Sequence, residues 1–401
     1  MNHPHTPHLL PGLQTIAEEM IEIRQQIHQY PELGFEEFET AKLVADSLKR
    51  WGYQVETGIG KTGVVGQLKM GEGPKIAIRA DMDALKIKEE NQLPYKSRRE
   101  GIMHACGHDG HTATLLAAAK YIAENPHFKG TLNLFFQPAE EGLGGAKAMI
   151  EDGVLEKYPC DAIFGFHNMP GFPLGHFGFK TGAALASSDH VTVTIKGKGG
   201  HAAMPSFTID PIVAASSIVL NLQSIVSRNV SPLEMTVISV GSIHGGTTFN
   251  VIPDNVTMQL SVRNLDADVQ DLVEERIKSL IQSQAASYGA TAEIDYIRSY
   301  PILHNSQKET DFARKVAIDC YGEEKIIPNF PAMTGSEDFA FFSQKLPSSY
   351  LFVGNGTEGT HGCSVHNPHY DFNDQLIPIV ANYWVNLLYR YCPIDSSRIK
   401  S

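Results

Sequence analysis

The sequence predicts an α/β protein interrupted by a second, inserted α+β domain. At 401 residues the chain is more than twice the usual domain length of about 150 residues, so we expect more than one hydrophobic core. Hydrophobic residues make up 42% of the chain and charged residues 19%, as in packed globular proteins. Short apolar runs alternate with helical patterns near both ends of the chain, whereas the middle carries a different order of elements.

Two helices are expected first, because apolar residues recur at helical spacing before Pro31 and again from Phe38 to Leu48. Four short apolar runs then follow, with a helical stretch, Thr112–Ala123, between the second and the third. Short strands that alternate with helices are typical of a largely parallel sheet. The four runs are Val64–Leu68, Lys75–Ala80, Thr131–Phe136 and Ala162–Phe166.

The inserted domain is predicted between Ser187 and Tyr300, where the order of elements becomes β-α-β-β-α-β, that of the ferredoxin-like unit. After Pro301 the alternation of helices and strands resumes. We therefore predict a discontinuous first domain, residues 1–186 and 301–401, and an insertion formed by residues 187–300. The strands expected in the insertion are Val191–Ile195, Thr236–Ile243, Val256–Arg263 and Thr291–Ile297, and its helices are Pro211–Val226 and Ala267–Tyr288.

Charge and composition exclude several classes of function. The net charge of −12 argues against nucleic acid as a partner, because binding to a phosphate backbone depends on positive charge. No stretch approaches the roughly 18 consecutive apolar residues of a membrane helix. Five cysteines are too few for a disulfide framework, and the start lacks the pattern of a signal peptide, so we expect a cytoplasmic protein. The histidines of the first ten residues, His3, His5 and His8, are expected in a disordered start.

The densest group of polar residues is His104-Ala-Cys-Gly-His-Asp-Gly-His111, immediately before the predicted helix at Thr112. A thiolate and several imidazoles within one turn suit a borderline-soft divalent ion, and Gly107 and Gly110 allow the backbone to bend. The alternative is a helix start at which Asp109 serves as a cap. Since a cap explains one polar residue and not five, we favour metal ligation.

Further candidate ligands directly follow the predicted strands. Asp81 and Asp83 come after the second apolar run, Glu140 and Glu141 after the third, and His167 after the fourth. In open α/β sheets the carboxyl ends of the strands line the ligand crevice, so these groups should converge there. The paired glutamates could instead form a solvated helix start. Beside the Cys–His turn, however, one can bind metal while the other accepts a proton from water.

The last candidate ligand of this region lies in the loop after the predicted strand Tyr350–Val353. This loop carries His361, His366 and His369, and surface loops hold idle histidines about as often as ligands. We choose His366 as the candidate. In the insertion, spacing alone favours ordinary turn and surface positions for His201, Asn250 and Arg263 and assigns them no function.

Taken in order, several segments form a longer pattern that covers nearly the whole chain, from about Arg24 to Asp374. The pattern resembles the aminoacylase and carboxypeptidase-G-like dinuclear metallopeptidases, and best their amidohydrolase subgroup, which includes hippurate hydrolase and auxin-conjugate hydrolases. One departure is Lys86, where many relatives have proline. The segments are Arg79-Ala-Asp-Met-Asp83-Ala-Leu, His104–His111, Phe136-Gln-Pro-Ala-Glu-Glu141-Gly, Gly199-Gly-His201, Asn250-Val-Ile-Pro253 and Ser336-Glu-Asp338-Phe.

The resemblance implies a catalytic metallopeptidase domain with two divalent ions and an inserted dimerisation domain that acts as a lid. Zinc is the expected metal, with manganese or cobalt as alternatives. Glu140 would be the general base and Asp83 would orient a ligand. His201 would stabilise the oxyanion, and Asn250 and Arg263 would lie near the substrate carboxylate. The implied metal ligands are Cys106, His108, Glu141, His167 and His366.

The activity that the resemblance implies is hydrolysis of the amide bond of an N-acyl amino acid, with N-benzoylglycine as the expected substrate and a homodimer as the expected assembly. The alternatives are a dipeptidase or exopeptidase, or an N-acetyl-amino acid deacylase, with the same chemistry. A metal-dependent binding protein is the alternative outside enzymes. The adjacent pair Glu140-Glu141 favours an enzyme, because a binding protein needs the ligand but not the neighbouring base.

Overall fold

The computed structural model describes residues 9–394, so His3, His5 and His8 lie outside the described residues. The chain divides into two compact units. The first unit comprises Met1–Gly182, His304–Pro331 and Phe341–Ser401, and the second comprises Ala183–Leu303 and Ala332–Ala340. Residues 187–300, predicted as the insertion, all fall in the second unit, which also takes in a short segment that the sequence pattern did not indicate.

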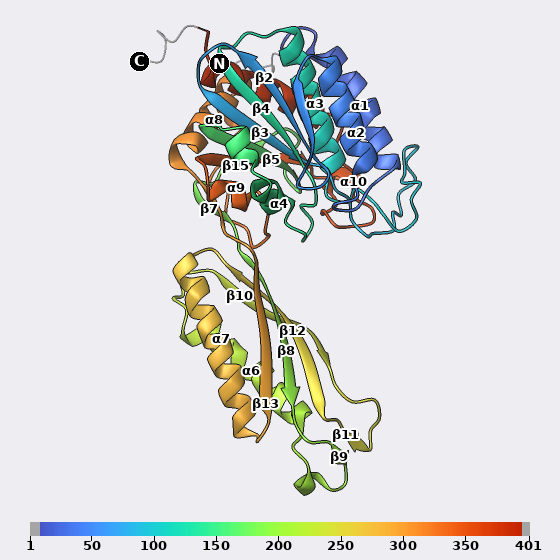
Figure 1. The fold of residues 1–401 in the computed structure, drawn as a ribbon, viewed down its shortest axis with the longest axis vertical. Coiled ribbons are helices and arrows are strands. Elements are labelled where there is room, and N and C mark those ends of the chain that lie inside the picture. Colours follow the sequence, from blue (N-terminus) through green and yellow to red (C-terminus); the bar gives the residue numbers. More distant parts are fainter. Residues whose placement is uncertain (1–8, 395–401) are drawn as a thin grey trace. The chain divides into compact units, whose positions relative to one another are not determined.

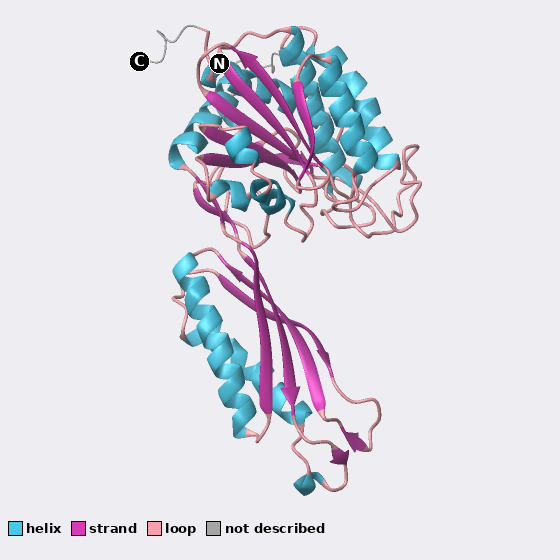
Figure 2. Cartoon of the chain, in the orientation of Figure 1, coloured by secondary structure: helices cyan, strands magenta, loops and turns pink. Residues whose placement is uncertain are grey.

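A seven-stranded mixed sheet forms the centre of the first unit, in the order β1-β2-β4-β3-β5-β15-β6 (Figures 1 and 2). The four inner strands β4, β3, β5 and β15 run parallel, whereas the outer strands pair antiparallel. This confirms the predicted mixed, largely parallel sheet. The strands are β1 (Gln54–Ile59), β2 (Gly63–Met70), β3 (Lys75–Asp81), β4 (Gly130–Gln137), β5 (Ala162–Pro170), β6 (Phe177–Gly178) and β15 (Ser348–Gly356).

Helix α3 (His108–Glu124) is buried on nearly all sides, because it packs against β3 and also against α1 (Leu13–Gln29) and α11 (Leu376–Tyr391). Its run Leu115–Ala119 consists of leucines and alanines that are all buried, and the small alanines let neighbouring elements approach closely. Helix α2 (Phe38–Arg50) packs beside β1 and β2 (Figure 1). The first turn of α3 is thereby held at the carboxyl end of β3, where Thr112 Oγ1 donates to the carbonyl of Asp81.

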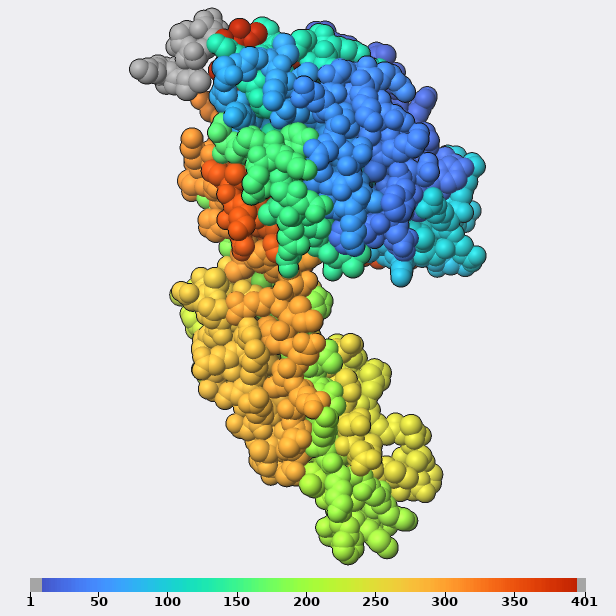
Figure 3. All heavy atoms as spheres, in the orientation of Figure 1, coloured from blue at the N-terminus to red at the C-terminus, as the bar shows by residue number. Residues whose placement is uncertain are grey.

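The second unit has an antiparallel four-stranded sheet in the order β10-β12-β8-β13, which is the ferredoxin-like order for β-α-β-β-α-β connectivity. Alternate residues of β8 and β12 are buried, so the apolar side chains face the two helices. Atoms of α7 and β13 lie side by side on the visible face of this unit (Figure 3). Its main elements are β8 (Ser188–Lys196), α6 (Pro211–Arg228), β10 (Thr236–His244), β12 (Asn255–Asn264), α7 (Ala267–Ser287) and β13 (Thr291–Tyr300).

Shorter elements connect these parts. They are α4 (Gly145–Glu151), α5 (Val154–Lys157), β7 (Gly182–Leu185), β9 (Gly200–His201), β11 (Val251–Ile252), β14 (Leu303–Asn305), α8 (Gln307–Tyr321), α9 (Ala340–Ser343), α10 (Gly359–Gly362) and two 3-10 turns, Pro205–Phe207 and Glu323–Lys325. Within residues 9–394, no helix is both long and apolar enough to cross a membrane.

One local prediction, and one alternative that was not favoured, are wrong. Strand β5 continues to Pro170, so His167 lies within the strand and not after it, because pairing with β15 extends over Phe352 opposite His167. Asp109 is also not a helix cap, the alternative weighed above. Helix α3 begins at His108 after Gly107, and no side chain caps it. The Asp109 carboxylate is instead buried against Arg24 and His28 of α1.

Candidate metal and catalytic site

The turn before α3 presents Cys106 and His108 on either side of Gly107. Gly107 has φ 92°, a left-handed conformation that favours glycine. A Cβ atom there would lie 2.5 Å from both Asn168 Oδ1 and Tyr370 Oη, so the backbone approaches these side chains more closely than any other residue would allow. Glycine is therefore required both by the conformation and by the space.

The structure gathers all five predicted metal ligands and Glu140 in the first unit. Cys106 Sγ lies 3.3 Å from His167 Nε2, and His366 Nε2 lies 3.2 Å from Glu141 Oε1. Three overlapping sets each have their donor atoms within 4.8 Å of one another, which is close enough to share ions. The sets are Cys106 with His108 and His167, Cys106 with Glu141 and His366, and His108 with Glu140 and Glu141.

The donor set fits a divalent cation on two grounds. His108 Nε2 is buried without a hydrogen-bond partner among the described residues, and a buried polar atom left unpaired costs about 1–3 kcal/mol. The surrounding thiol, imidazole and carboxylate groups are the ligand types that zinc and similar borderline ions prefer. The orphaned nitrogen and the chemistry of its neighbours therefore both point to a metal.

Protonation of the cluster agrees with this assignment. Burial, followed by the charges of Glu141 and Glu140, raises the pKa of the Cys106 thiol well above its usual value. Burial alone would lower the pKa of His108, but Asp81 and Asp83 raise it to about 10. Without a cation, the cluster therefore holds protons that a divalent ion would displace, because metal ligands must be deprotonated.

Asp83 fixes two of the donor segments. Its Oδ1 lies 3.1 Å from His108 Nδ1, the ring nitrogen opposite the orphaned Nε2, and its Oδ2 accepts the backbone N–H of Glu141 at 2.9 Å. A carboxylate on the far nitrogen of a ligating imidazole sets its tautomer and orientation. This contact agrees with the orienting role that the resemblance implies for Asp83.

A second group of supporting residues was not among the ligands or catalytic residues that we chose from the sequence. Asp81 Oδ1 lies 2.6 Å from His111 Nδ1, and His111 Nε2 lies 2.7 Å from Asn168 Oδ1. Asp81, His108 and His111 also form a buried set with donor atoms within 4.8 Å. The signals for them in the sequence were the place of Asp81 at the end of a predicted strand and of His111 in the histidine-rich turn.

Two non-glycine residues of the site have left-handed backbones, Ala139 at φ 52° and His366 at φ 62°. The N–H of His366 donates to the carbonyl of Ala105 at 2.7 Å, which ties the His366 loop to the Cys106 turn. Such conformations persist only where the surrounding structure holds them, and they concentrate at functional sites.

The three residues predicted in the insertion belong to the second unit. His201 in β9 pairs with Val251 in β11, and the N–H of Ala202 donates to the carbonyl of Asn250 at 3.1 Å, so His201 and Asn250 are neighbours. Arg263 Nη1 donates to Ser336 Oγ at 2.8 Å. These three are therefore not part of the cluster built within the first unit.

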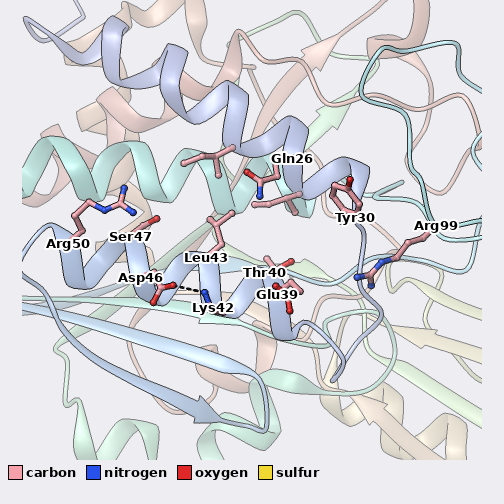
Figure 4. Close-up of a pocket in the computed structure, with 12 residues that line it drawn as sticks. Gln26, Tyr30, Glu39, Thr40, Lys42, Leu43, Asp46, Ser47, Arg50 and Arg99 are labelled. Carbon is pink, nitrogen blue, oxygen red and sulfur yellow. Dashed lines mark hydrogen bonds and ion pairs between the residues drawn. The ribbon is translucent and has the colours of Figure 1, made fainter.

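A pocket of about 500 Å³ lies between α1 and α2 (Figure 4). Its lining is mixed, with Ile23 and Leu43 beside Arg50 and the ion pair of Lys42 with Asp46. None of the predicted ligands or catalytic residues lines it. The concentration of donor atoms, and not this pocket, marks the candidate site.

Comparison with known proteins agrees with this geometry. Residues 77–390 match the peptidase family M20/M25/M40. A hippurate hydrolase of Campylobacter jejuni is 47% identical over 96% of this chain and 99% of its own, and an N-acetyl-L-cysteine deacetylase of Bacillus subtilis is 42% identical over 93% and 88%. A solved Bacillus subtilis structure, described as a dinuclear metal binding peptidase from the M20 family, matches with TM-score 0.82 and 33% identity over 94% of this chain and 99% of that chain.

The family match covers most of the chain, and the similarity to curated relatives extends over nearly all of it. The resemblance drawn from the sequence motifs is therefore confirmed, as is the prediction of an enzyme. This chain belongs to peptidase family M20/M25/M40 and is a metal-dependent amidohydrolase of that family.

Proposed function

We propose that this protein hydrolyses the amide bond of N-acyl amino acids, with N-benzoylglycine as its substrate and benzoate and glycine as the products. The observation that carries the proposal is the buried Glu140 beside the donor cluster, on a chain 47% identical to a hippurate hydrolase over nearly its whole length. An acidic group next to a set of metal donors is the arrangement that hydrolysis by an activated water requires.

Five residues would hold two divalent ions: Cys106, His108, Glu141, His167 and His366. Bound there, the ions would lower the pKa of a water and polarise the amide carbonyl. Zinc suits the cysteine donor, whereas manganese or cobalt suits the imidazole and carboxylate donors equally well. The Cys106 thiol must lose its proton when metal binds, so metal binding should release protons and strengthen as the pH rises.

Glu140 supplies the proton transfers. Its carboxylate lies with His108 and Glu141 in one set of donor atoms, so it reaches the place where the attacking water would sit. It takes the proton of that water as the C–O bond forms, and it delivers the proton to the leaving nitrogen as the C–N bond breaks. Asp83 keeps the His108 ring in place during both proton transfers through the 3.1 Å contact between its Oδ1 and His108 Nδ1.

Residues of the second unit would complete substrate binding. His201 would donate a hydrogen bond to the tetrahedral oxyanion, and Asn250 and Arg263 would hold the carboxylate of the substrate. The Arg263 side chain is half-buried and already oriented by Ser336, so its planar guanidinium is preorganised for a carboxylate. Replacing Arg263 by lysine should raise KM more than it lowers kcat.

We also propose that the protein is a homodimer formed through the second unit. Strand β10 is an edge of the four-stranded sheet, so within residues 9–394 only one of its sides pairs in this sheet, and an edge of this kind can pair with another chain. Large apolar side chains are exposed in the same unit, among them Leu220, Leu233 and Phe249. Light scattering at working concentration should give twice the mass of one chain, and a monomer would count against the proposal.

A second candidate activity is deacylation of N-acetyl amino acids, supported by the 42% identity to an N-acetyl-L-cysteine deacetylase. Purified protein with quantified metal should be assayed on N-benzoylglycine, N-acetylcysteine, an indoleacetyl amino acid and a dipeptide. The highest kcat/KM on N-benzoylglycine supports the proposal, and the highest value on another substrate redirects it. Bound metal without turnover on any of the four would favour a binding protein.

The role of Glu140 is tested by Glu140→Gln. We expect kcat to fall about 10²–10⁴-fold with two metals retained, because general base catalysis is lost while the ligands stay. Glu141→Gln serves as the contrast, since it removes a proposed ligand and should reduce the metal content. Near-normal turnover of metal-loaded Glu140→Gln would refute the assignment.

A further inference from the structure

The turn that carries Glu140 and Glu141 begins with a strained residue. Ala139 has φ 52°, and a left-handed backbone costs a residue with a Cβ atom about 1–2 kcal/mol. The strain is sustained only if neighbouring groups hold the turn. One such contact is within the turn itself, where the N–H of Gly145 donates to the carbonyl of Ala139 at 3.0 Å.

Two carboxylates from distant parts of the chain hold alternate N–H groups of this turn. Glu37 Oε1 accepts from the N–H of Ala139 at 2.8 Å, and Asp83 Oδ2 accepts from the N–H of Glu141 at 2.9 Å. Glu140 therefore lies between two residues whose backbones are anchored from outside. Asp83 already has a role in orienting His108, whereas Glu37 has none.

Glu37 is itself held in place. Its side chain is buried, and Oε2 accepts the hydroxyl of Thr62 at 2.5 Å. Glu37 belongs to the loop between α1 and α2, residues 30–37. This loop packs directly on the turn, because a Cβ atom at Gly34 would lie 3.0 Å from the Cα of Ala139. A second contact joins this loop to the residue after Asp83: the N–H of Ala84 donates to the carbonyl of Glu32 at 2.7 Å.

We propose that Glu37 is a positioning residue that holds Ala139 in its left-handed conformation and thereby directs Glu140 toward the reacting water and Glu141 toward the metal. The inference rests on the proposed roles of Glu140 and Glu141. The hydrogen bond accepted by Oε1, and not the charge, performs this function. In support, burial raises the pKa of Glu37 to about 7, so the neutral side chain is well populated near neutral pH.

The test compares Glu37→Gln with Glu37→Met. Glutamine keeps an oxygen for the Ala139 N–H and can donate to Thr62, so kcat should stay within about threefold. Methionine fills similar space without an acceptor, and kcat should fall about 10–100-fold with KM within about threefold, because small misplacements of catalytic groups cost rate. A fall in Glu37→Gln equal to that in Glu37→Met would overturn the inference.

Glu32→Met is the matched control. Glu32 lies in the same loop, is equally buried and also accepts backbone N–H groups, from Glu39 at 3.2 Å and Thr40 at 2.9 Å. These N–H groups belong to the start of α2, not to the catalytic turn. Glu32→Met should lower Tm as much as Glu37→Met does while leaving kcat within about threefold. An equal loss of kcat in both variants would show that general loosening of the loop suffices, and would refute a specific role of Glu37.

A second variant tests the mechanism through Ala139. Glycine adopts positive φ without steric cost, so Ala139→Gly needs less help from Glu37. In the Glu37→Met background, Ala139→Gly should recover kcat by about 3–10-fold, whereas in the wild-type background it should change kcat by less than about threefold. No recovery in the double variant would contradict the proposal.

Metal affinity separates this inference from the proposed function. Cobalt(II) titrated into metal-free protein, followed by the absorption of its thiolate complex, should bind about 10-fold more weakly to Glu37→Met, because Glu141 is displaced, and with unchanged affinity to Glu37→Gln. This readout needs no substrate. If N-benzoylglycine is not turned over by the wild type, the proposed substrate fails while the cobalt series still decides the role of Glu37, and equal affinity of Glu37→Met and the wild type overturns it.

Discussion

Replacing the buried Arg24 by methionine should destabilise the first unit strongly. Arg24 joins three distant segments: its Nε lies 3.0 Å from Asp109 Oδ2, behind the Cys–His turn, and its Nη2 donates to Asp371 Oδ1 at 2.5 Å and to the carbonyl of Phe372 at 3.3 Å. All these groups are buried. Arg24→Met keeps only the apolar stem of the side chain. It leaves two buried carboxylates without this cation, and also the partly exposed Asp374, whose Oδ1 lies 3.3 Å from Nη1.

The magnitude follows from the partners that remain. Breaking a buried ion pair by removing one member costs about 3–5 kcal/mol. Asp109 keeps His28 at 2.8 Å and Asp371 keeps the Tyr95 hydroxyl at 2.9 Å, so the total should not exceed this range. For a unit of roughly 270 residues, with about 2.1 cal/mol/K of unfolding entropy per residue, the loss corresponds to a fall in Tm of about 5–9 °C.

The assay is differential scanning calorimetry of the metal-loaded wild type and variant, with Arg390→Met as the control. Arg390 pairs with Asp319 in the same unit, but both side chains are over a third exposed, so its removal should cost less than about 1 kcal/mol. A fall in Tm below about 2 °C for Arg24→Met, or an equal fall for the control, would contradict a stabilising role of the buried ion pairs of Arg24.

Three further predictions concern pH, backbone and metal. Burial lowers the pKa of His28, but the carboxylate of Asp109 outweighs this effect and raises the pKa to about 9. Because this value lies above the unfolded value of 6.5, protonated His28 stabilises the fold fully below pH 6.5, and this stabilisation is lost as the pH rises through 9. In chemical denaturation, the difference in unfolding free energy between wild type and His28→Gln should therefore shrink by about 3 kcal/mol from pH 6.5 to pH 9. A difference that does not change with pH would contradict this prediction. Gly107→Ala should cost more than about 2 kcal/mol and weaken metal binding, because its Cβ would meet Asn168 and Tyr370; unchanged calorimetric stability would contradict this. Chelation should lower stability by about 3–4 kcal/mol when the metal had been at 100–1,000 times Kd, and re-addition should restore it, whereas an unchanged Tm in chelator would argue against ligation by this cluster.

The sequence pattern predicted the fold class and the place of the candidate site. Buried strands and helices have local apolar periods, so the alternating pattern predicted the mixed sheet of the first unit, which the structure confirms. The polar residues Glu140 and Glu141 follow one such run directly. Because parallel strands end at one edge of a sheet, residues after different strands could be placed together without knowing a single contact.

Long-range packing sets which groups support these residues. Glu37 contacts Ala139 across 102 residues of sequence, and Arg24 contacts Asp371 across 347. The spacing of apolar residues along a strand or helix does not indicate contacts between residues so far apart in the sequence. The extension of β5 through His167 likewise depends on pairing with β15, nearly two hundred residues away. Hydrogen bonds and ion pairs between buried groups arise where packing brings the atoms together. The sequence therefore predicted the chemical groups of the candidate site, whereas the packing of the first unit fixes how those groups are oriented.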